Sequence, residues 1–414
     1  MRSEYSPRVR GIAWMTTLVY FTSYLLRKNL GVMLVKVCSD MGVLESALAA
    51  TLTGLTICYG GGQLLSGWLG DKIAPERLVL CGMIVASLAN VAIYFTDSIP
   101  LMTVVWCING VAHSMFWAPI VKLYTVYLTD KEYGYAMMRL MFGSTFATVF
   151  LRIFCPAMLF VVDWRTIMLI LALFGAAVGV LFAISSRRLF VTPVAVNAAE
   201  PREAEAEEIK PLPRFALPMT ALIIIAIIMH GMLREGVDVW MPSFLCSTFG
   251  MPEENAIFST VILSIFGMFS FTVFDYLYRH VFKNELTCSA FIFGLSTVAA
   301  AVLYALTRTG GSMIVSMLMM AVIIGCMSGV NLILVATVPK RYKKSGKVAT
   351  FTGVLDAAAY LGAAIATYGF AALFENRGWS ATIFVWALVG GAGVLFCLLA
   401  LPLFKKFRKT YADT

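Results

Sequence analysis

The sequence RRLFVTPVAVNAAEPREAEAEEIKPLPR, residues 187–214, is a polar stretch inside a chain that is otherwise rich in apolar residues. Its middle is acidic and it contains several prolines, so it cannot bury a hydrophobic core and we expect a flexible linker. Hydropathy predicts six apolar segments on each side of it. The twelve predicted spans are 11–35, 46–70, 76–95, 100–128, 134–160, 164–187, 215–245, 256–279, 284–308, 312–338, 347–374 and 379–404.

Composition places this chain in a membrane. Hydrophobic residues make up 60% of the 414 residues and charged residues only 13%, whereas a soluble domain has roughly 25% charged residues. A membrane-spanning helix needs about 20 apolar residues, which the predicted segments supply. We therefore predict an all-α membrane protein with twelve transmembrane helices. It is divided into an N-terminal half (1–187), a linker (188–214) and a pseudo-symmetric C-terminal half (215–414).

The positive charges are distributed unevenly along the predicted loops. Because twelve is an even number of spans, both termini lie on one side of the membrane. Lys and Arg gather at the termini, in the linker and in the loops of that side, whereas the opposite loops carry few of them. The positive-inside rule then predicts cytoplasmic termini in a multi-pass protein of a bacterial inner membrane. The rule explains the net charge of +9 without a nucleic-acid partner, and the run 405–409 is expected to contact lipid headgroups.

Two arginines lie inside predicted spans at a similar depth, Arg27 in the first span and Arg234 in the seventh. A charge there costs roughly 2.5–3.5 kcal/mol on insertion scales, so it marks a candidate functional site. A guanidinium group matches phosphate oxygens bidentately and stays charged. If the halves are repeats, the two arginines are predicted to face each other across a central cavity and bind one phosphate-sized anion. The alternative is that each neutralises a buried acid such as Asp238 or Asp356.

A short signature follows the second predicted span. The stretch GWLGDKIAPERL, residues 67–78, resembles the signature of the major facilitator superfamily, in which Gly-x-x-x-Asp-Arg/Lys joins two helices tightly. Asp71 is expected to pair with a cation of a neighbouring helix and to hold one gate closed; a solvated loop carboxylate is the alternative. Asp238 is the second residue expected to have a gating or structural role.

Several longer motifs extend the resemblance along nearly the whole chain. They are YFTSYLLRKNL (20–30), YGGGQLLSGWLGDK (59–72), TDKEYG (129–134), LREGVDVWMPSFL (233–245) and GVLDAAAYLGAAIAT (353–367). With these motifs the chain resembles the organophosphate:phosphate antiporters of the major facilitator superfamily, which include glycerol-3-phosphate and hexose-6-phosphate transporters. The resemblance implies alternating access and exchange of inorganic phosphate for an organic phosphate.

The resemblance also implies roles for individual residues. Arg27 and Arg234 match the arginines that clamp the phosphoryl group, and Tyr20 and Tyr24 match tyrosines that line the site. Helical spacing independently places Tyr20, Tyr24 and Arg27 on one face of a helix. For the two tyrosines, packed core aromatics are the alternative interpretation.

The chain departs from the glycerol-phosphate pattern at several positions. Gln63 stands where those transporters have a lysine, and Ser144 lies near the position of a histidine. The acid that follows the Leu-Arg motif is shifted to Asp238, and Asp356 has no counterpart in that pattern. Phosphate recognition is expected to be retained, whereas the organic part of the substrate need not be glycerol.

Three further residues are candidates for contact with the substrate. His230 precedes Arg234 by one helical turn and could donate a hydrogen bond or carry a proton; a core histidine is the alternative. Asp356 could bind a substrate hydroxyl, or pair with Lys28, Arg139 or Arg152. Lys28 faces about 100° away from its neighbour Arg27. It is expected either to pair with an acid or to touch the substrate.

No set of catalytic residues is recognisable. The nine cysteines include no CxxC pair, the three histidines have no zinc-type spacing, and no phosphate-binding loop motif is present. We expect no metal, no cofactor and no enzymatic activity. The predicted function is a monomeric secondary transporter that exchanges a phosphorylated small metabolite for inorganic phosphate. Two alternatives stay open: a proton-coupled symporter of a carboxylate such as a sugar acid, and a transporter-like sensor of sugar phosphates.

Overall fold

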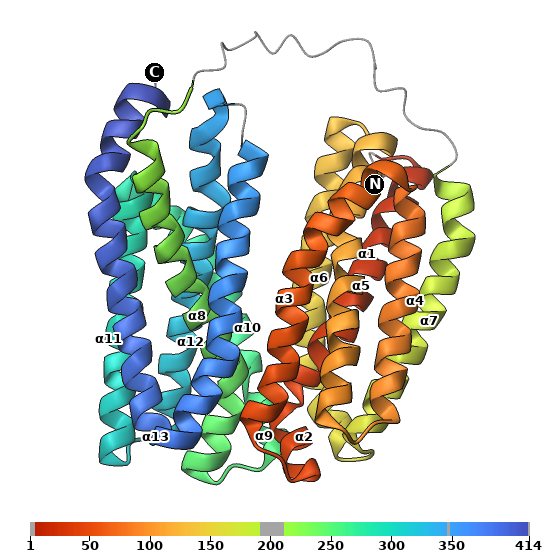
Figure 1. Ribbon diagram of the computed structural model, residues 1–414, viewed down its shortest axis with the longest axis horizontal. Coiled ribbons are helices and arrows are strands. Elements are labelled where there is room, and N and C mark those ends of the chain that lie inside the picture. Colours follow the sequence, from red (N-terminus) through yellow and green to blue (C-terminus); the bar gives the residue numbers. More distant parts are fainter. Residues whose placement is uncertain (1–4, 191–210, 346–347, 413–414) are drawn as a thin grey trace. The chain divides into compact units, whose positions relative to one another are not determined.

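The computed structural model describes residues 5–190, 211–345 and 348–412 (Figure 1). Over these residues the secondary structure is helical and contains no strand, which confirms the predicted all-α class. The greater part of the predicted linker, 191–210, lies outside the described residues. The chain forms two compact units: Met1–Pro201 with Glu253–Phe258, and Arg202–Pro252 with Ser259–Thr414. Each unit is a bundle of long helices.

Unit 1 contains the helices that precede the linker. They are α1 (Pro7–Val32), α2 (Leu34–Met41), α3 (Glu45–Lys72), α4 (Pro75–Tyr94), α5 (Ile99–Tyr127), α6 (Asp130–Leu159) and α7 (Trp164–Leu189). Nearly all of the short helix α9 (Glu253–Ser259) also belongs to unit 1. There Lys36 of α2 forms ion pairs with Asp40 at 3.0 Å and with Glu253 at 3.3 Å.

Unit 2 contains the remaining helices, several of which end in a π- or 3₁₀-turn. They are α8 (Ala216–Phe249), α10 (Val261–Leu277), η1 (Tyr278–Phe282), α11 (Glu285–Thr309), α12 (Met313–Val330), η2 (Asn331–Thr337), η3 (Val338–Ser345), α13 (Val348–Phe407) and η4 (Arg408–Ala412). Helix α13 is interrupted at Gly378, whose φ of 76° lies in the left-handed region that glycine adopts without strain. It therefore covers the last two predicted spans.

The helices match the predicted spans. Within the described parts of the chain, nine helices are long and apolar enough to cross a membrane. Helices α1 and α3 cover the first two predicted spans, and α13 covers two. The all-helical, multi-span architecture predicted from hydropathy is thereby confirmed.

A repeated hydrogen bond reveals the internal symmetry of the two units. In unit 1 the hydroxyl of Thr16 on α1 bonds the phenol of Tyr124 near the end of α5. In unit 2 the hydroxyl of Thr220 on α8 bonds the phenol of Tyr342 in η3 at 2.7 Å. Both hydroxyls also donate to the carbonyl four residues earlier in their own helix. The first long helix of each unit is thus anchored in the same way.

The helices that carry Arg27 and Arg234 pack closely against a neighbour. On α6, a Cβ added to Gly143 would lie 2.7 Å from the methyl group of Thr17 on α1. On α8, a Cβ at Gly231 would lie 2.1 Å from the carbonyl oxygen of Ala359 on α13. Gly362 of α13 approaches the carbonyl of Ile228 equally closely. These contacts fix the α1–α6 and α8–α13 pairs, because any side chain at such a position would force the helices apart.

Candidate functional site

Arg27 lies on α1 of unit 1 and is half-buried. The central carbon of its guanidinium group lies 4.5 Å from the ring centroid of Tyr24 and 5.0 Å from that of Tyr59 on α3. Aromatic faces attract cations, so the two rings hold the charged group inside the helical bundle. The guanidinium N–H groups lie in the plane of the group, where they remain suited to donating hydrogen bonds.

Tyr20 and Tyr24 continue the same face of α1. Their ring centroids are 5.3 Å apart in an edge arrangement, and Tyr24 lies within hydrogen-bonding reach of both Tyr20 and Arg27. Trp117 of α5 closes the group, with its ring centroid 5.9 Å from that of Tyr20. The structure therefore brings together the three α1 residues that helical spacing placed on one face, and it adds Tyr59 and Trp117 from other helices.

A buried network of asparagines holds α1 next to Arg27. Asn29 donates to the side-chain oxygen of Asn90 on α4 at 2.7 Å. Asn90 in turn donates to the backbone carbonyls of Leu26 and Ala86, both at 2.9 Å. Asn109 of α5 also donates to the carbonyl of Leu26, at 3.1 Å. Since Leu26 and Asn29 flank Arg27, three helices together fix the backbone that presents it.

We expect Asn90→Ala to lower the free energy of unfolding by about 2 kcal/mol, because the buried amide of Asn29 and the carbonyl of Leu26 both lose a partner. The measurement is thermal unfolding of the purified protein in detergent. Asn376→Ala is the matched control, since Asn376 is exposed and donates only to a carbonyl of its own helix. Equal melting temperatures for the two variants would contradict the stabilising role of the buried asparagine network.

His113 of α5 lies beside this network and is 3% exposed. Its Nδ1 lies 2.8 Å from the carbonyl of Asn109, and its Nε2 lies 2.7 Å from the carbonyl of Ser23 on α1. A neutral imidazole has one N–H and can satisfy one of the two carbonyls, whereas a protonated ring can satisfy both. The charge of Arg27 is close enough to interact with this ring. The ring is therefore a buried polar element beside Arg27.

In unit 2, Arg234 is half-buried on α8 and has two of the predicted residues around it. His230, one turn earlier, is fully buried beside Arg234 and next to Asn331 of η2. Neither of its ring nitrogens makes a well-formed hydrogen bond within the described residues. Asp356 of α13 has an exposed side chain near enough to Arg234 for the two charges to attract.

Asp356 interacts with Arg234, a cation of its own unit. Arg139 and Arg152 belong to unit 1, where Arg139 lies 4.8 Å from the ring centroid of Trp14 and 4.4 Å from that of Tyr135, and Arg152 is buried. Asp356 lies in unit 2 and interacts electrostatically with Arg234. Asp356, one of the two acids considered as partners of Arg234, therefore lies close enough to interact with it.

The four remaining predicted residues lie on α1, α3 and α8. Gln63 is half-buried on α3, one turn after Tyr59 and hence on its face. Lys28 is half-buried and its charge acts on Tyr24. Asp238 is half-buried on α8 and has an interaction partner. Asp71 lies in the last turn of α3, but its side chain is outside the described residues, so its gating role stays a prediction.

The described part of the chain offers no group of three His, Cys, Asp or Glu side chains arranged to hold a metal ion. The polar groups around Arg27 are cations, phenols and amides, which donate hydrogen bonds. Such a donor set suits an anion.

The sequence model of the Major Facilitator Superfamily matches residues 16–367 of this chain. The chain belongs to the Major Facilitator Superfamily. The family is one of transporters, and this major facilitator protein is accordingly a multi-pass membrane transporter and not an enzyme.

Three curated relatives of this major facilitator protein are named as transporters or transport proteins. A glycerol-3-phosphate transporter of Bacillus subtilis is 20% identical over 81% of this chain and 79% of its own length. A probable hexose phosphate transport protein of Chlamydia muridarum is 27% identical over 28% of this chain. A probable sulfoacetate transporter of Cupriavidus necator is 24% identical over 29% of this chain. The last two matches span only 25% and 28% of the relatives' own lengths.

A solved structure confirms the fold. A bacterial homolog of the human lysosomal transporter Spinster, in an inward-facing and unoccupied conformation, has a TM-score of 0.76 to this protein. The alignment covers 99% of this chain and 98% of that one at 11% sequence identity. At this identity the similarity establishes the major facilitator fold alone.

Proposed function

We propose that this major facilitator protein exchanges a phosphorylated small metabolite for inorganic phosphate by alternating access. The observation that carries the proposal is the environment of Arg27. Its guanidinium group is held between two tyrosine rings at 4.5 Å and 5.0 Å from their centroids. A charge-assisted, bidentate hydrogen bond to phosphate is the strongest use of such a group. The relatives named as hexose phosphate and glycerol-3-phosphate transporters support the same substrate class.

Arg234 is the proposed second phosphate-binding group. Like Arg27, it lies on the first long helix of its unit, and that helix is anchored by an equivalent threonine–tyrosine bond. Asp356 lies near Arg234 and partly balances its charge while no anion is bound. A bound phosphate then competes with this acid for the guanidinium group. Tyr20, Tyr24, Gln63, His230 and Lys28 are proposed to contact the rest of the substrate.

Obligatory exchange follows from the charges of the site. Without a bound anion, the charges of Arg27 and Arg234 lie in a medium of low dielectric constant, so the change between the two orientations is proposed to be slow. A bound phosphate or organic phosphate neutralises these charges and permits the change. The proposed setting is a bacterial inner membrane, with a monomeric protein and both termini in the cytoplasm.

Counterflow into proteoliposomes tests the proposal. Vesicles loaded with inorganic phosphate are expected to take up labelled phosphate, and unlabelled hexose phosphates or glycerol phosphate are expected to compete for this uptake. Vesicles without internal phosphate are expected to show little uptake. Transport that runs equally well with no phosphate on either side would contradict the exchange mechanism.

A second candidate function has one observation in its favour. The relative named as a probable sulfoacetate transporter indicates that a non-phosphorylated organic anion could also be carried on this scaffold. In that case His230 or Asp356 would carry a coupled proton. Uptake of a carboxylate or sulfonate that is driven by a pH gradient in phosphate-free vesicles would favour this function over phosphate exchange.

A further inference from the structure

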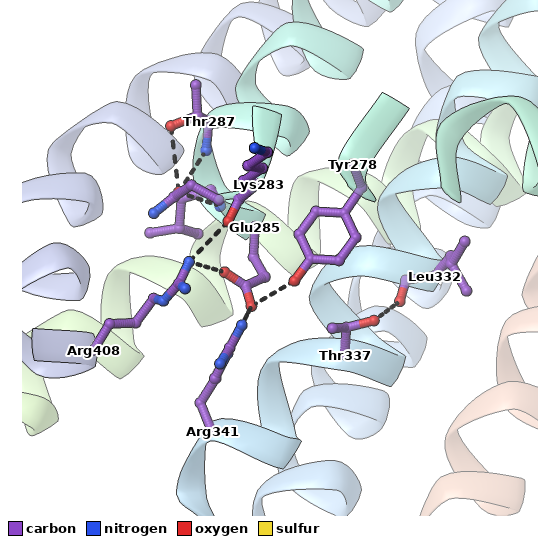
Figure 2. Close-up of polar contacts among 10 residues, drawn as sticks. Tyr278, Lys283, Glu285, Thr287, Leu332, Thr337, Arg341 and Arg408 are labelled. Atoms are coloured by element: carbon purple, nitrogen blue, oxygen red, sulfur yellow. Dashed lines mark hydrogen bonds and ion pairs between the residues drawn. The ribbon is translucent and has the colours of Figure 1, made fainter. Parts of the chain in front are cut away.

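A buried carboxylate organises one end of unit 2, at the start of α11. Glu285 is fully buried, and its Oε1 accepts hydrogen bonds from Arg341 at 2.7 Å and from the phenol of Tyr278 at 2.9 Å. Its Oε2 pairs with Arg408 at 3.3 Å. Figure 2 shows the two arginines reaching Glu285 from different elements, η3 and η4. One carboxylate therefore faces two guanidinium groups.

Arg408 connects this cluster to a hollow on the surface. Its Nη1 also donates to the backbone carbonyl of Lys283 at 2.9 Å, which fixes the orientation of the guanidinium group (Figure 2). The hollow has a volume of about 490 Å³ and is lined by Asn284, Lys405, Arg408 and Lys409. Lys405 and Lys409 are exposed and lie one turn apart. Three cations thus line one concave surface, and one of them, Arg408, is paired with Glu285.

An apolar stripe leads along α13 to the same hollow. Leu395, Leu398 and Leu399 are 53%, 49% and 51% exposed. Residues three or four apart lie on one face of a helix, and this spacing continues through Pro402 to Lys405 and Lys409. In a membrane-spanning helix such an exposed apolar stripe contacts acyl chains. The hollow therefore begins where the lipid-facing surface ends.

We propose that this hollow binds the headgroup of an anionic phospholipid. The phosphate group meets Lys405, Arg408 and Lys409, while the acyl chains lie along the leucine stripe. The stripe distinguishes a lipid from a free phosphate ion, which would gain nothing from it. The three cations favour a headgroup with net negative charge over a zwitterionic one, because a zwitterion brings a cation of its own into the hollow. The site is independent of the transport substrate.

Native mass spectrometry of the purified full chain tests this site. Phosphatidylglycerol is expected to stay bound under conditions that remove phosphatidylcholine. Lys405→Gln/Lys409→Gln is expected to weaken phosphatidylglycerol binding about 30-fold, since each cation near a membrane surface contributes a factor of about five. Lys409→Gln alone is expected to give about fivefold. Both lysines are exposed, and an unchanged melting temperature without lipid verifies that the variants fold.

Arg187→Gln/Arg188→Gln is the matched control. These exposed arginines end α7 of unit 1 and also follow exposed apolar residues, such as Leu181 and Ile184. The control substitutions remove the same charge at a helix end, but these arginines do not line the hollow, so phosphatidylglycerol binding there is expected to stay within about twofold of the parent protein. The proposal is overturned if the control loses as much binding as the lysine variant, or if the lysine variant loses none. It is also overturned if inorganic phosphate displaces the lipid at equal concentration, which would indicate a free-anion site.

Discussion

Arg27→Lys is expected to reduce phosphate exchange in proteoliposomes by about 10- to 100-fold. Lysine keeps the positive charge but loses the planar fork, so one of two charge-assisted hydrogen bonds to the phosphate group disappears, at a cost of roughly 1.5–3 kcal/mol. Lysine also lacks the planar group that stacks on the rings of Tyr24 and Tyr59. The measurement is the initial rate of labelled phosphate uptake against internal phosphate.

Arg234→Lys is expected to give a loss of the same order, because both arginines are proposed to bind the phosphate group. Arg187→Lys is the control. It makes the same chemical change at an exposed position at the end of α7, outside the residues proposed to bind the substrate. Phosphate exchange by both Arg27→Lys and Arg234→Lys at the rate of the parent protein would refute the proposed role of the guanidinium groups. A loss in one variant only would restrict phosphate binding to that arginine.

The α1 part of the candidate site could be read from the sequence because it depends on one helix. Tyr20, Tyr24 and Arg27 repeat at intervals of three or four residues, and the helical period alone brings them together. Tyr59 and Asn90 could not be found in this way. Each reaches the Arg27 region from another helix, and their alignment with it depends on how α3 and α4 pack against α1 and α5.

The span pattern was equally accessible to sequence, because a long apolar segment in a membrane has little choice but to form a helix. The assignment of residues 253–258 to unit 1 could not be read from the sequence. They follow α8 directly, yet they belong to unit 1, where Glu253 pairs with Lys36. The pairing of Glu285 with Arg341 and Arg408 was also hidden, since 56 and 123 residues separate the partners. Hydropathy reports which segments are buried in lipid and carries no information about such distant ion pairs.

Arg341→Ala is expected to destabilise unit 2 by about 3–5 kcal/mol, because it leaves a buried carboxylate without its main partner. Glu285 is fully buried, and both the Nε and an Nη of Arg341 lie 2.7 Å from its Oε1. Among the described residues, Tyr278 and the longer contact with Arg408 would remain. The measurement is the apparent melting temperature in detergent, with an expected decrease on the order of 10 °C. Arg279→Ala is the control. Its pair with Asp275 is also 2.7 Å long, but the two side chains are 66% and 39% exposed, so water screens the pair and its loss is expected to cost at most about 1 kcal/mol.

A second substitution separates the buried charge from simple loss of packing. In the Arg341→Ala background, Glu285→Gln removes the unpaired negative charge while the amide oxygen can still accept the hydrogen bond from Tyr278. The double variant is therefore expected to melt above Arg341→Ala, because breaking a buried pair costs more than replacing both of its charges. If the double variant melts no higher than the single one, the instability comes from lost contacts of the arginine side chain, and the ionic explanation of this cluster is wrong.

Glu285→Gln also has an expected effect on the lipid site, since Arg408 is oriented by Glu285 and by the carbonyl of Lys283. If Glu285→Gln frees Arg408 to turn fully toward the hollow, phosphatidylglycerol binding rises, which links the strength of headgroup binding to a carboxylate that no lipid touches.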